Sequence, residues 1–480
     1  MIQNQGPIVK DARRLQQIKE TLWAELCERH LPVVHPGSIW RHNREILPSD
    51  PAQGWKLHIA ATLPNACWVL QTVAPLLRRR GVLWKAPVSL DEVAKLNAGI
   101  YYGYSQVGKF LTIYPRDTAE ALLLARRLHE PTRKMSAPTI PFDLKYRADG
   151  CVYYRYGAFK RLAVGADAKS ESAICNPEGN LIVDKRDSLI GKPDWVDDPF
   201  ITRRSRQPKR DSNSQLRTTF KVFRAMAQRG KGGVYQAIDL SVMPPRLCIL
   251  KEGRKDGEVD WQGRDGFWRA NHEVVVLRAL NGAGVGAPAV YSSFKAEKNY
   301  YIAAEFIDGE DLEKWLHRKK RRLAISAAMK LGIEIADLVS RIHSAGWVWR
   351  DCKPRNIIRS IDRRLRPIDF EGACPVNQPD QFPFGTTTYI APETHDQFHG
   401  QSRLPEDLYA LGVTLFILFT GRPPDIAIPG PERLRRNLPK AVGRLIGQLM
   451  HADPKRRPNA QSAVRRLKTA LKDLKNKRSR

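Results

Sequence analysis

The spacing of apolar residues changes along the chain, and these changes predict an α+β fold with more than one domain. A helical lead-in is predicted over residues 1 to about 50, where apolar side chains recur at helical spacing: Leu15, Ile18, Leu22, Trp23 and Leu26. Between residues 55 and about 165, short β-rich runs alternate with helices; the predicted strands are 55–62, 109–114 and 152–159, and the predicted helix is 118–129. From Phe220 the order becomes strand, strand, helix, strands and, after Asp311, mainly helices, which indicates a two-lobed second domain.

A chain of 480 residues is too long for a single hydrophobic core, so two or three domains are expected. Residues 200–217 are polar and basic, which is typical of a linker. We therefore predict an N-terminal α/β domain over residues 1–200, a basic linker over 201–217 and a second domain over 218–480.

The formal net charge of +30 attracts anions such as phosphates, acidic peptides and nucleic acid. Because the cations are spread over several clusters, a solvated basic surface is the simplest interpretation. A groove for an acidic or phosphorylated peptide is the more specific alternative. No nucleic-acid-binding module is recognisable, so nucleic acid is not an expected partner.

Three observations predict a cytoplasmic protein that does not enter a membrane. No apolar run approaches the roughly 20 residues that span a bilayer. The first residues lack the basic-then-apolar pattern of a signal peptide. The 7 cysteines include no C-x-x-C pair, which argues against a disulfide framework and a structural zinc site.

One short segment carries the groups that phosphoryl transfer from ATP requires. Residues 349–356 read Trp-Arg-Asp-Cys-Lys-Pro-Arg-Asn, and Asp369 follows thirteen residues after Asn356. Asp351 would accept the proton of the attacking hydroxyl or orient it, and Lys353 would neutralise charge on the moving phosphoryl group. Asn356 and Asp369 would hold Mg²⁺.

At these motifs, residues 221–474 resemble the protein kinase family. The resemblance implies a two-lobed kinase that uses Mg²⁺ and ATP, with GTP as the alternative nucleotide. It assigns nucleotide binding to a glycine-rich turn, a strand lysine and the acid that pairs with this lysine: Gly230, Gly232, Gly233, Val234, Lys251 and Glu273. The turn departs from the family spacing, because Ala227 and Arg229 stand where earlier glycines are expected.

Further kinase positions are matched or replaced in an interpretable way. Trp349 stands where the family has histidine and Glu371 where it has glycine, so we predict a repacked loop that keeps its chemistry and a metal-binding acid that is held in place. Asp407 is expected to anchor the catalytic loop, which comprises residues 349–356, and Arg457 is expected to pair with Glu393. A pseudokinase is the alternative, which is disfavoured because Lys251, Asp351, Asn356 and Asp369 are all present.

The N-terminal half places cations and one histidine on consecutive predicted strands: Lys56, His58, Lys85, Lys109 and Arg155. Lys56 and His58 share one strand face, because side chains alternate along a strand. Eliminating phosphate from phosphoserine or phosphothreonine requires a base for the Cα proton, an acid for the leaving phosphate and cations to hold it. A lysine beside other cations has a lowered pKa and can be the base. Taken alone, the Lys-x-His pair is more typical of a solvated strand face, and the aromatic run around Arg155 is more typical of core packing, than of a catalytic site.

Over residues 50–200 this half resembles the lyase domain of class III and class IV lanthionine synthetases, which is similar to bacterial phosphothreonine lyase effectors. The resemblance assigns the general base to Lys85 and the general acid to His58. It assigns the phosphate ligands to Lys56, Arg155 and Lys109. One departure concerns Asp143-Leu144-Lys145, which replaces an Asp-Arg-Arg-like element. A phosphate contact is therefore either lost or supplied by Lys145.

Together the two halves predict a dehydratase that acts on peptides. The kinase would phosphorylate Ser or Thr of a precursor peptide, for which an acidic leader is suggested by the positive charge, and the lyase would leave dehydroalanine or dehydrobutyrine. The cyclase domain of these synthetases is expected to be missing, so ring closure would be spontaneous or left to a separate cyclase. The alternatives are a signalling Ser/Thr kinase whose N-terminal half binds phosphopeptides, a non-catalytic scaffold for acidic partners, and a lyase fold without activity.

Overall fold

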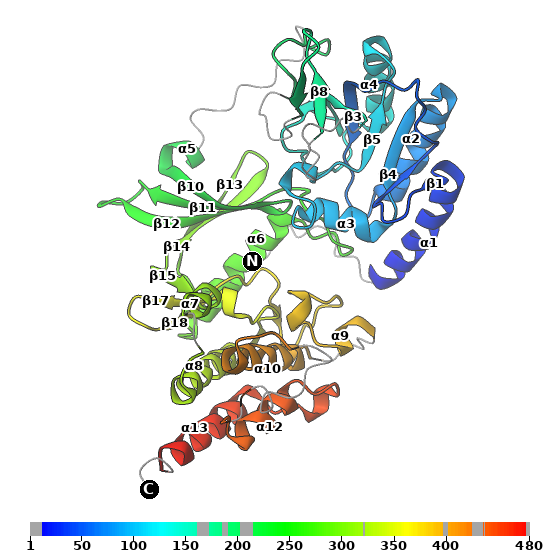
Figure 1. Ribbon diagram of the computed structural model, residues 1–480. Helices are drawn as coiled ribbons and strands as arrows, with labels where there is room; N and C mark the ends of the chain where they lie inside the picture. Colours follow the sequence, from blue (N-terminus) through cyan, green and yellow to red (C-terminus); the bar gives the residue numbers. More distant parts are fainter. Residues whose placement is uncertain are drawn as a thin grey trace. The chain divides into compact units, whose positions relative to one another are not determined.

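The computed structural model describes residues 12–160, 172–184, 191–201, 215–319, 322–396, 402–424, 435 and 437–476. The chain divides into two compact units (Figure 1). The first comprises residues 1–246, 250–268 and 294–301, and the second comprises residues 247–249, 269–293 and 302–480.

A seven-stranded sheet forms the centre of the N-terminal region, with the strand order β1-β2-β4-β5-β3-β7-β6. The strands are β1 (Val33–Val34), β2 (Trp40–His42), β3 (Gln53–Ile59), β4 (Leu83–Pro87), β5 (Leu111–Tyr114), β6 (Leu144–Lys145) and β7 (Val152–Ala158). Neighbouring strands run antiparallel. Strands β4, β3 and β7, which carry Lys85, Lys56, His58 and Arg155, therefore lie in the middle of the sheet together with β5. Lys109 lies just before β5, not on the strand as predicted.

Four helices accompany this sheet: α1 (Ala12–His30), α2 (Ala66–Arg80), α3 (Leu90–Ala98) and α4 (Thr118–Thr132). Helix α4 packs on β3 and β7, and α2 packs on α1 and α4. Leu57 and Ile59 of β3 are fully buried on this apolar side, and burying such a side chain contributes about 1.5–3 kcal/mol. Because residues alternate along a strand, Lys56 and His58 face the opposite side of the sheet.

The structure confirms most of the predicted elements of this region and corrects one. The strands predicted over 55–62, 109–114 and 152–159 are β3, β5 and β7, and the predicted helix is α4. The helical lead-in is wrong after residue 30, where β1 and β2 follow; these strands have 2 and 3 residues, too few to show an alternating pattern. A separate hairpin contains β8 (Ala173–Cys175) and β9 (Leu181–Val183). The predicted linker lies largely on residues 202–214, outside the described residues, and the domain boundaries stay predictions.

The kinase-like region begins with α5 (Gln215–Thr219) and a five-stranded sheet in the order β10-β11-β12-β14-β13. Its strands are β10 (Phe220–Arg229), β11 (Gly232–Asp239), β12 (Arg246–Gly253), β13 (Val290–Ala296) and β14 (Asn299–Glu305), and helix α6 (Gly266–Gly282) lies between β12 and β13 in the chain. This order of elements confirms the predicted α+β fold with a sheet-rich first lobe.

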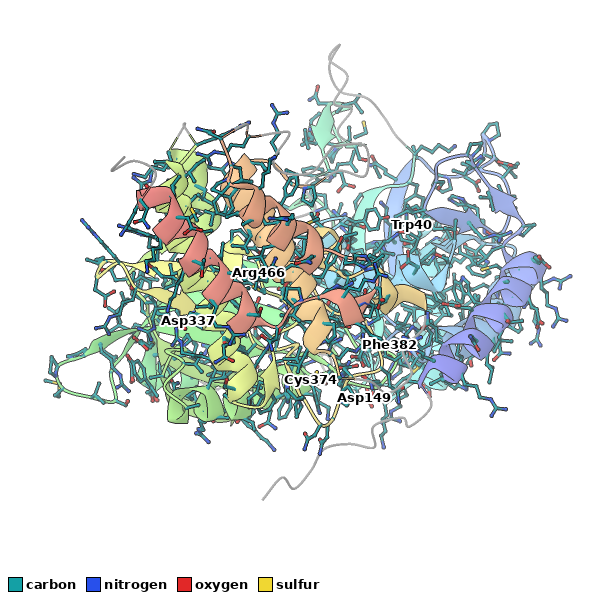
Figure 2. The ribbon with its side chains drawn as sticks, turned by 90° about the horizontal axis from the view of Figure 1, so that it is seen from below. Trp40, Asp149, Asp337, Cys374, Phe382 and Arg466 are labelled. Atoms are coloured by element: carbon teal, nitrogen blue, oxygen red, sulfur yellow. The ribbon has the colours of Figure 1, made fainter. Side chains whose placement is uncertain are left out.

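Helices dominate the rest of the chain: α7 (Leu312–Arg318), α8 (Ile325–Ser344), α9 (Glu393–Asp396), α10 (Leu404–Thr420), α12 (Lys440–Leu449) and α13 (Ala460–Asn476). Short strands accompany these helices: β15 (Gly309–Asp311) before α7, and β16 (Trp347–Val348), β17 (Ile357–Ser360), β18 (Leu365–Pro367) and β19 (Cys374–Pro375) between α8 and α9. Helix α13 packs on α8, and Figure 2 labels Arg466 on the first and Asp337 on the second. One apolar core joins α8, α10, α12 and α13 to the catalytic loop, where Trp349 is fully buried. Within the described part of the chain, no helix combines the length and apolar character needed to cross a membrane.

Candidate active sites

The register of the N-terminal sheet brings the predicted residues onto one face. Lys85 of β4 lies opposite Thr112 of β5, which lies opposite His58 of β3. In the next row, Lys56 of β3 lies opposite Arg155 of β7. Residues that pair directly across antiparallel strands point to the same face. The sequence alone places Lys56 and His58 on one strand face, and the strand pairing adds Lys85 and Arg155 to that face.

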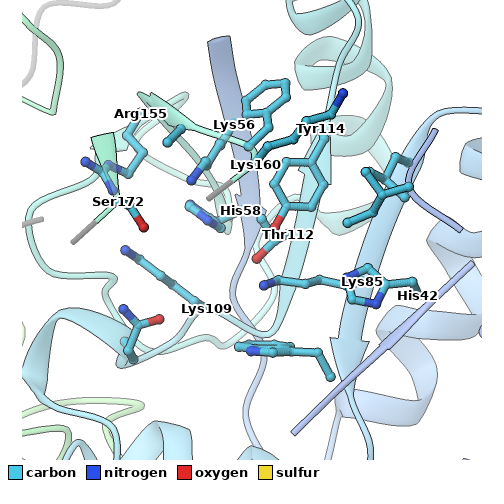
Figure 3. Close-up of a pocket in the computed structure, with 16 residues that line it drawn as sticks. His42, Lys56, His58, Lys85, Lys109, Thr112, Tyr114, Arg155, Lys160 and Ser172 are labelled. Atoms are coloured by element: carbon cyan, nitrogen blue, oxygen red, sulfur yellow. The ribbon is translucent and has the colours of Figure 1, made fainter. Parts of the chain in front are cut away.

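These side chains line a cavity of about 290 Å³ (Figure 3). The lining includes all five residues predicted for elimination: Lys56, His58, Lys85, Lys109 and Arg155. Lys160, His42 and Ser172 also contribute, and no carboxylate is among the described lining residues. Lys56, His58, Lys109 and Arg155 are each less than a tenth exposed. Such a concentration of partly desolvated cations suits a doubly charged anion such as a phosphate monoester.

A buried carboxylate orients His58. Oδ2 of Asp143 lies 2.6 Å from Nδ1 of His58, and Oδ1 forms an ion pair with Nζ of Lys109 at 3.2 Å. With Nδ1 engaged in this way, Nε2 is the nitrogen left for a proton exchange with substrate. Burial works to raise the pKa of Asp143, but Lys109 and His58 outweigh it and lower the value to about 2. Asp143 therefore stays charged.

The protonation state of His58 depends on what occupies the cavity. Burial, against the opposing charge and hydrogen bond of Asp143 and with smaller contributions from Lys109 and Lys56, lowers the pKa of His58 to about 4. The imidazole is thus neutral near pH 7 in the free protein. A phosphate dianion beside it favours the protonated ring.

A second buried carboxylate holds Arg155. Its Nη2 lies 2.6 Å from Oδ1 of Asp184, whose other oxygen accepts the backbone N–H of Ala158 at 3.1 Å. A Cβ at Gly157 would approach this carboxylate to 2.8 Å, so only glycine leaves room for the pair. Asp184 fixes one side of the guanidinium.

The predicted base, Lys85, lies near aromatic side chains of β2 and β5. Nζ of Lys85 lies 4.4 Å from the ring centre of Trp40 and 5.9 Å from that of Tyr114. His42 stands opposite Lys85 in the β2–β4 register. Burial and then the charge of Lys85 lower the pKa of His42 to about 4, so this ring is neutral.

Sequence reasoning gave no role to Asp143, Asp184 and Trp40, and it left the role of Lys145 open. Lys145 is outside the cavity lining, and its ammonium donates to the carbonyl of Ala148 at 3.0 Å. It is therefore not placed to replace the missing arginine. In the sequence, Asp143 is marked only by its place in the element 143–145, which departs from the family pattern. Its pairing with His58, which lies 85 residues away, cannot be inferred from local spacing.

In the kinase-like region, Asp407 anchors the catalytic loop as predicted. Its carboxylate accepts the backbone N–H of Trp349 at 2.7 Å and that of Arg350 at 2.6 Å. The indole of Trp349 donates to the carbonyl of Asp369 at 3.3 Å and stacks on Phe370 with ring centres 5.5 Å apart. The tryptophan thus packs the loop against Asp369 and Phe370, in agreement with the predicted structural role.

The predicted pair between Arg457 and Glu393 is also confirmed. Two parallel hydrogen bonds, of 2.6 and 2.7 Å, join the guanidinium to the carboxylate. The Arg457 side chain is fully buried, whereas Glu393 is 27% exposed. This bidentate geometry ties α9 to the segment before α13.

The catalytic loop leaves one acidic oxygen available. Oδ2 of Asp351 accepts from Nζ of Lys353 at 2.7 Å and from Nδ2 of Asn356 at 2.7 Å. Oδ1 is buried and has no hydrogen-bond partner among the described residues. Burial raises the pKa of Asp351, with Lys353 opposing and Asp369 reinforcing the shift. An acid with one unbonded oxygen and a raised pKa suits a group that accepts a proton from a hydroxyl.

The predicted metal ligands fit Mg²⁺ by their chemistry. Asn356 donates its amide hydrogens to Asp351, which leaves its amide oxygen as a ligand. Asp369 supplies a carboxylate from a left-handed backbone with φ of 67°. One amide and one carboxylate oxygen match an ion that is otherwise held by phosphate and water.

The nucleotide-binding predictions fall on both units. Residues Gly230 and Lys231 form the two-residue turn between β10 and β11, since Arg229 pairs with Gly232. A Cβ at Gly232 would lie 1.7 Å from the carbonyl of Glu252, so this glycine is required by the neighbouring strand. Gly233 and Val234 continue β11, and Lys251 lies on β12.

Helix α6 carries Glu273, the predicted partner of the strand lysine. Its carboxylate accepts the backbone N–H of Phe370 at 3.1 Å, and the neighbouring His272 contacts the carbonyl of Ala373 at 2.7 Å. The helix therefore holds the backbone directly after Asp369. The ion pair between Glu273 and Lys251 stays a prediction.

Arg350 fixes the segment that follows Asp369, the predicted metal ligand. Its guanidinium pairs with Asp380 at 3.1 Å and with Glu406 at 3.4 Å, and it donates to the carbonyls of Gly372 and Phe382. The Arg350 side chain is 1% exposed. Many kinases order this segment by pairing such an arginine with a phosphorylated residue. Here Asp380 supplies the negative charge without modification.

Comparisons with known proteins cover both regions. The family model described as RamC, N-terminal domain, matches residues 29–212, and the protein kinase domain model matches residues 230–467.

Three relatives illustrate the two similarities. A probable SapB synthase of Streptomyces coelicolor is 30% identical over 400 residues, which are 80% of this chain and 41% of the relative. The probable serine/threonine-protein kinase PknB of Lactococcus lactis is 26% identical over 263 residues, 54% of this chain and 39% of the relative. Serine/threonine-protein kinase F of Synechocystis is 28% identical over 215 residues, 41% of this chain and 43% of the relative. The chain spans less than half the length of each. It combines a RamC-type N-terminal domain with a protein kinase domain, the pairing that its resemblance to class III and class IV lanthionine synthetases predicted.

Proposed function

We propose that this protein phosphorylates Ser or Thr residues of a precursor peptide and then eliminates the phosphate, leaving dehydroalanine or dehydrobutyrine. The observation that carries the proposal is the cavity in which Lys85, His58 and three further predicted cations meet. A phosphate-binding pocket with both a base and an acid is needed for elimination and is superfluous for phosphorylation alone. The similarity to a probable SapB synthase over 80% of the chain supports a biosynthetic role.

The first step uses the catalytic loop. The free oxygen of Asp351 takes the proton of the substrate hydroxyl as its oxygen attacks phosphorus, and Lys353 stabilises the charge of the transferred group. When bound to ATP, Mg²⁺ would neutralise the phosphate oxygens, with Asn356 and Asp369 as its protein ligands. The product is a phosphate ester, whose phosphate leaves far more readily than hydroxide.

The second step uses the cavity. Nζ of Lys85 takes the Cα proton, the electrons of the Cα–H bond form the Cα–Cβ double bond, and the Cβ–O bond breaks toward phosphate. His58, protonated in the presence of the dianion, gives the proton from Nε2 to the leaving oxygen. Lys56, Lys109 and Arg155 hold the phosphate throughout. The balance is one peptide alkene and one inorganic phosphate for each ester.

A signalling kinase with a phosphopeptide-binding N-terminal half is the second candidate. The matches to bacterial serine/threonine kinases favour it, and so does the lowered pKa of His58, which leaves Nε2 of the ring without a proton in the free protein. This candidate binds the phosphate ester and leaves it intact.

One experiment separates these candidates. The protein is incubated with ATP, Mg²⁺ and a Ser-rich precursor peptide, and separately with a synthetic phosphothreonine peptide, and masses and released phosphate are followed. Dehydration of the first peptide and phosphate release from the second support the proposal. A stable phosphopeptide in both tubes contradicts it and supports the signalling kinase.

The unmodified carboxylate of Asp380 leads to a prediction about the first step. Removing one partner of a buried ion pair destabilises the fold by about 3–5 kcal/mol. The cost for Asp380 is smaller, because Glu406 still pairs with Arg350. We therefore expect Asp380→Asn to slow phosphorylation at least about tenfold, measured as phosphate transfer from labelled ATP, without slowing elimination from a ready-made phosphopeptide. Asp362→Asn, at a carboxylate that is 58% exposed, is the matched control. Full transfer activity in Asp380→Asn would contradict the role of this pair.

A further inference from the structure

The short strand β2 adds an aromatic ring to the wall of the phosphate cavity. Trp40 begins β2 and pairs with Pro87 at the end of β4, while His42 pairs with Lys85. The backbone N–H of Trp40 is held by the hydroxyl of Ser38 at 3.0 Å, and that hydroxyl donates to the carbonyl of Trp40 at 3.1 Å. The ring belongs to the cavity lining, and its centre lies 4.4 Å from Nζ of Lys85. Figure 3 labels Lys85 in this cavity.

This distance is well inside the range of a cation–π contact, in which the face of an indole attracts an ammonium. Tyr114, on β5, contacts the same nitrogen less closely, at 5.9 Å from its ring centre. Trp40 is thus the aromatic side chain closest to the predicted base among the described contacts.

The other charged groups that face the cavity destabilise an ammonium on Lys85, whereas the indole of Trp40 stabilises it. Besides Lys85, the described titratable and charged groups of the lining come from β2, β3, β5 and β7 and from the segments before β5 and after β7. They are His42, Lys56, His58, Lys109, Tyr114, Arg155 and Lys160. The cations among them repel an ammonium on Lys85, and the carboxylates Asp143 and Asp184 are already paired with His58, Lys109 and Arg155. Repulsion of this kind helps to make Lys85 a base, but it also opposes the positive charge that appears on Nζ as the Cα proton is taken.

We propose that Trp40 is a positioning residue for the elimination step, which holds Nζ of Lys85 toward the substrate and stabilises its ammonium as the proton is transferred. The inference rests on the proposed function of the cavity. Because the amine is neutral before the transfer and charged after it, the indole face stabilises the transition state more than the ground state. Such a differential contact raises the turnover rate instead of only improving binding.

The test compares Trp40→Leu and Trp40→Phe with the unaltered protein, using a phosphothreonine peptide and released phosphate as the readout. A cation–π contact of ordinary strength predicts a loss of about five- to tenfold in kcat for Trp40→Leu and a smaller loss for Trp40→Phe, which keeps an aromatic face. The ring favours the ammonium, so its removal makes Lys85 easier to deprotonate. The acid limb of the kcat/KM profile should therefore move to lower pH in Trp40→Leu and by less in Trp40→Phe.

Controls keep a structural effect apart from this one. Trp68, 46% exposed on α2 and absent from the cavity lining, gives the matched substitution Trp68→Leu, which should keep both rate and pH profile. Phosphorylation of a peptide by each variant reports on folding of the rest of the chain.

Three results would overturn the inference while leaving the proposed function intact: an unchanged kcat in Trp40→Leu, equal losses in the leucine and phenylalanine variants, or a pH profile that does not move. If Trp40→Leu fails to fold, the smaller shift in Trp40→Phe decides the question. Absence of phosphate release from the unaltered protein would instead refute the function of the cavity.

Discussion

Lys85→Ala is expected to halt the reaction after phosphorylation, so that a phosphorylated peptide accumulates in place of the dehydrated one. Lys85 lies in the cavity row that also contains Thr112 and His58, and it is the side chain assigned to the Cα proton. Loss of a positioned general base slows proton transfer by about 10²–10⁴-fold. Mass spectrometry of the precursor after incubation with ATP and Mg²⁺ would show retained phosphate.

A second substitution separates the base from the charge. Arginine keeps a positive charge at this position but is not deprotonated in proteins, so Lys85→Arg should still bind the phosphopeptide and should not eliminate phosphate. Lys145→Ala is the matched control, because Lys145 is outside the cavity lining and bonded to Ala148. If Lys85→Ala or Lys85→Arg releases phosphate at the rate of the control, the base has been assigned to the wrong residue.

The sequence predicted the chemical groups of this cavity better than the strand pairing and the neighbouring side chains that position them. Lys56 and His58 can be placed together because they alternate on one strand, and Lys85, Lys109 and Arg155 each lie on or beside a recognisable strand. What brings them together is the antiparallel register of four strands, which no local pattern reveals. The family resemblance supplied that information.

The residues that the sequence analysis missed share a physical cause. Asp143 and Asp184 pair with side chains 85 and 29 positions away, so their roles exist only in the folded chain. Trp40 lies on a strand of 3 residues inside a predicted helical lead-in, where alternation has no room to appear. Buried carboxylates and short edge elements thus escape an analysis that relies on periodicity.

The kinase-like region was more predictable, because its motifs have fixed roles and a fixed order. Asp407 and the Arg457–Glu393 pair were inferred by position and are confirmed by their hydrogen bonds. The contact of Arg350 with Asp380 was not predicted, since the segment after Asp369 lacks a repeating pattern. Its irregular backbone is held by side-chain bonds instead of by a helix or sheet.

Asp351→Asn should produce the opposite defect to Lys85→Ala. Asparagine can keep the contact with Lys353 and the shape of the loop, but it cannot accept the hydroxyl proton, so phosphorylation should fall by about 10²–10⁴-fold. Elimination should persist, because its groups all lie in the other site. A synthetic phosphothreonine peptide should therefore be converted by Asp351→Asn at the rate of the unaltered protein, while the unphosphorylated precursor remains unchanged in mass.

Mixing the two defective proteins gives the sharpest form of this test. Lys85→Ala makes a phosphopeptide that it cannot convert, and Asp351→Asn converts a phosphopeptide that it cannot make. If the ester is a true intermediate that can leave one molecule and enter another, the mixture dehydrates the precursor although neither variant does so alone. The control pairs Lys85→Ala with the double variant Asp351→Asn/Lys85→Ala and should give only phosphopeptide. A dehydrated product in that control, or complete inactivity of Asp351→Asn on the synthetic phosphopeptide, would show that the two sites do not divide the reaction as proposed.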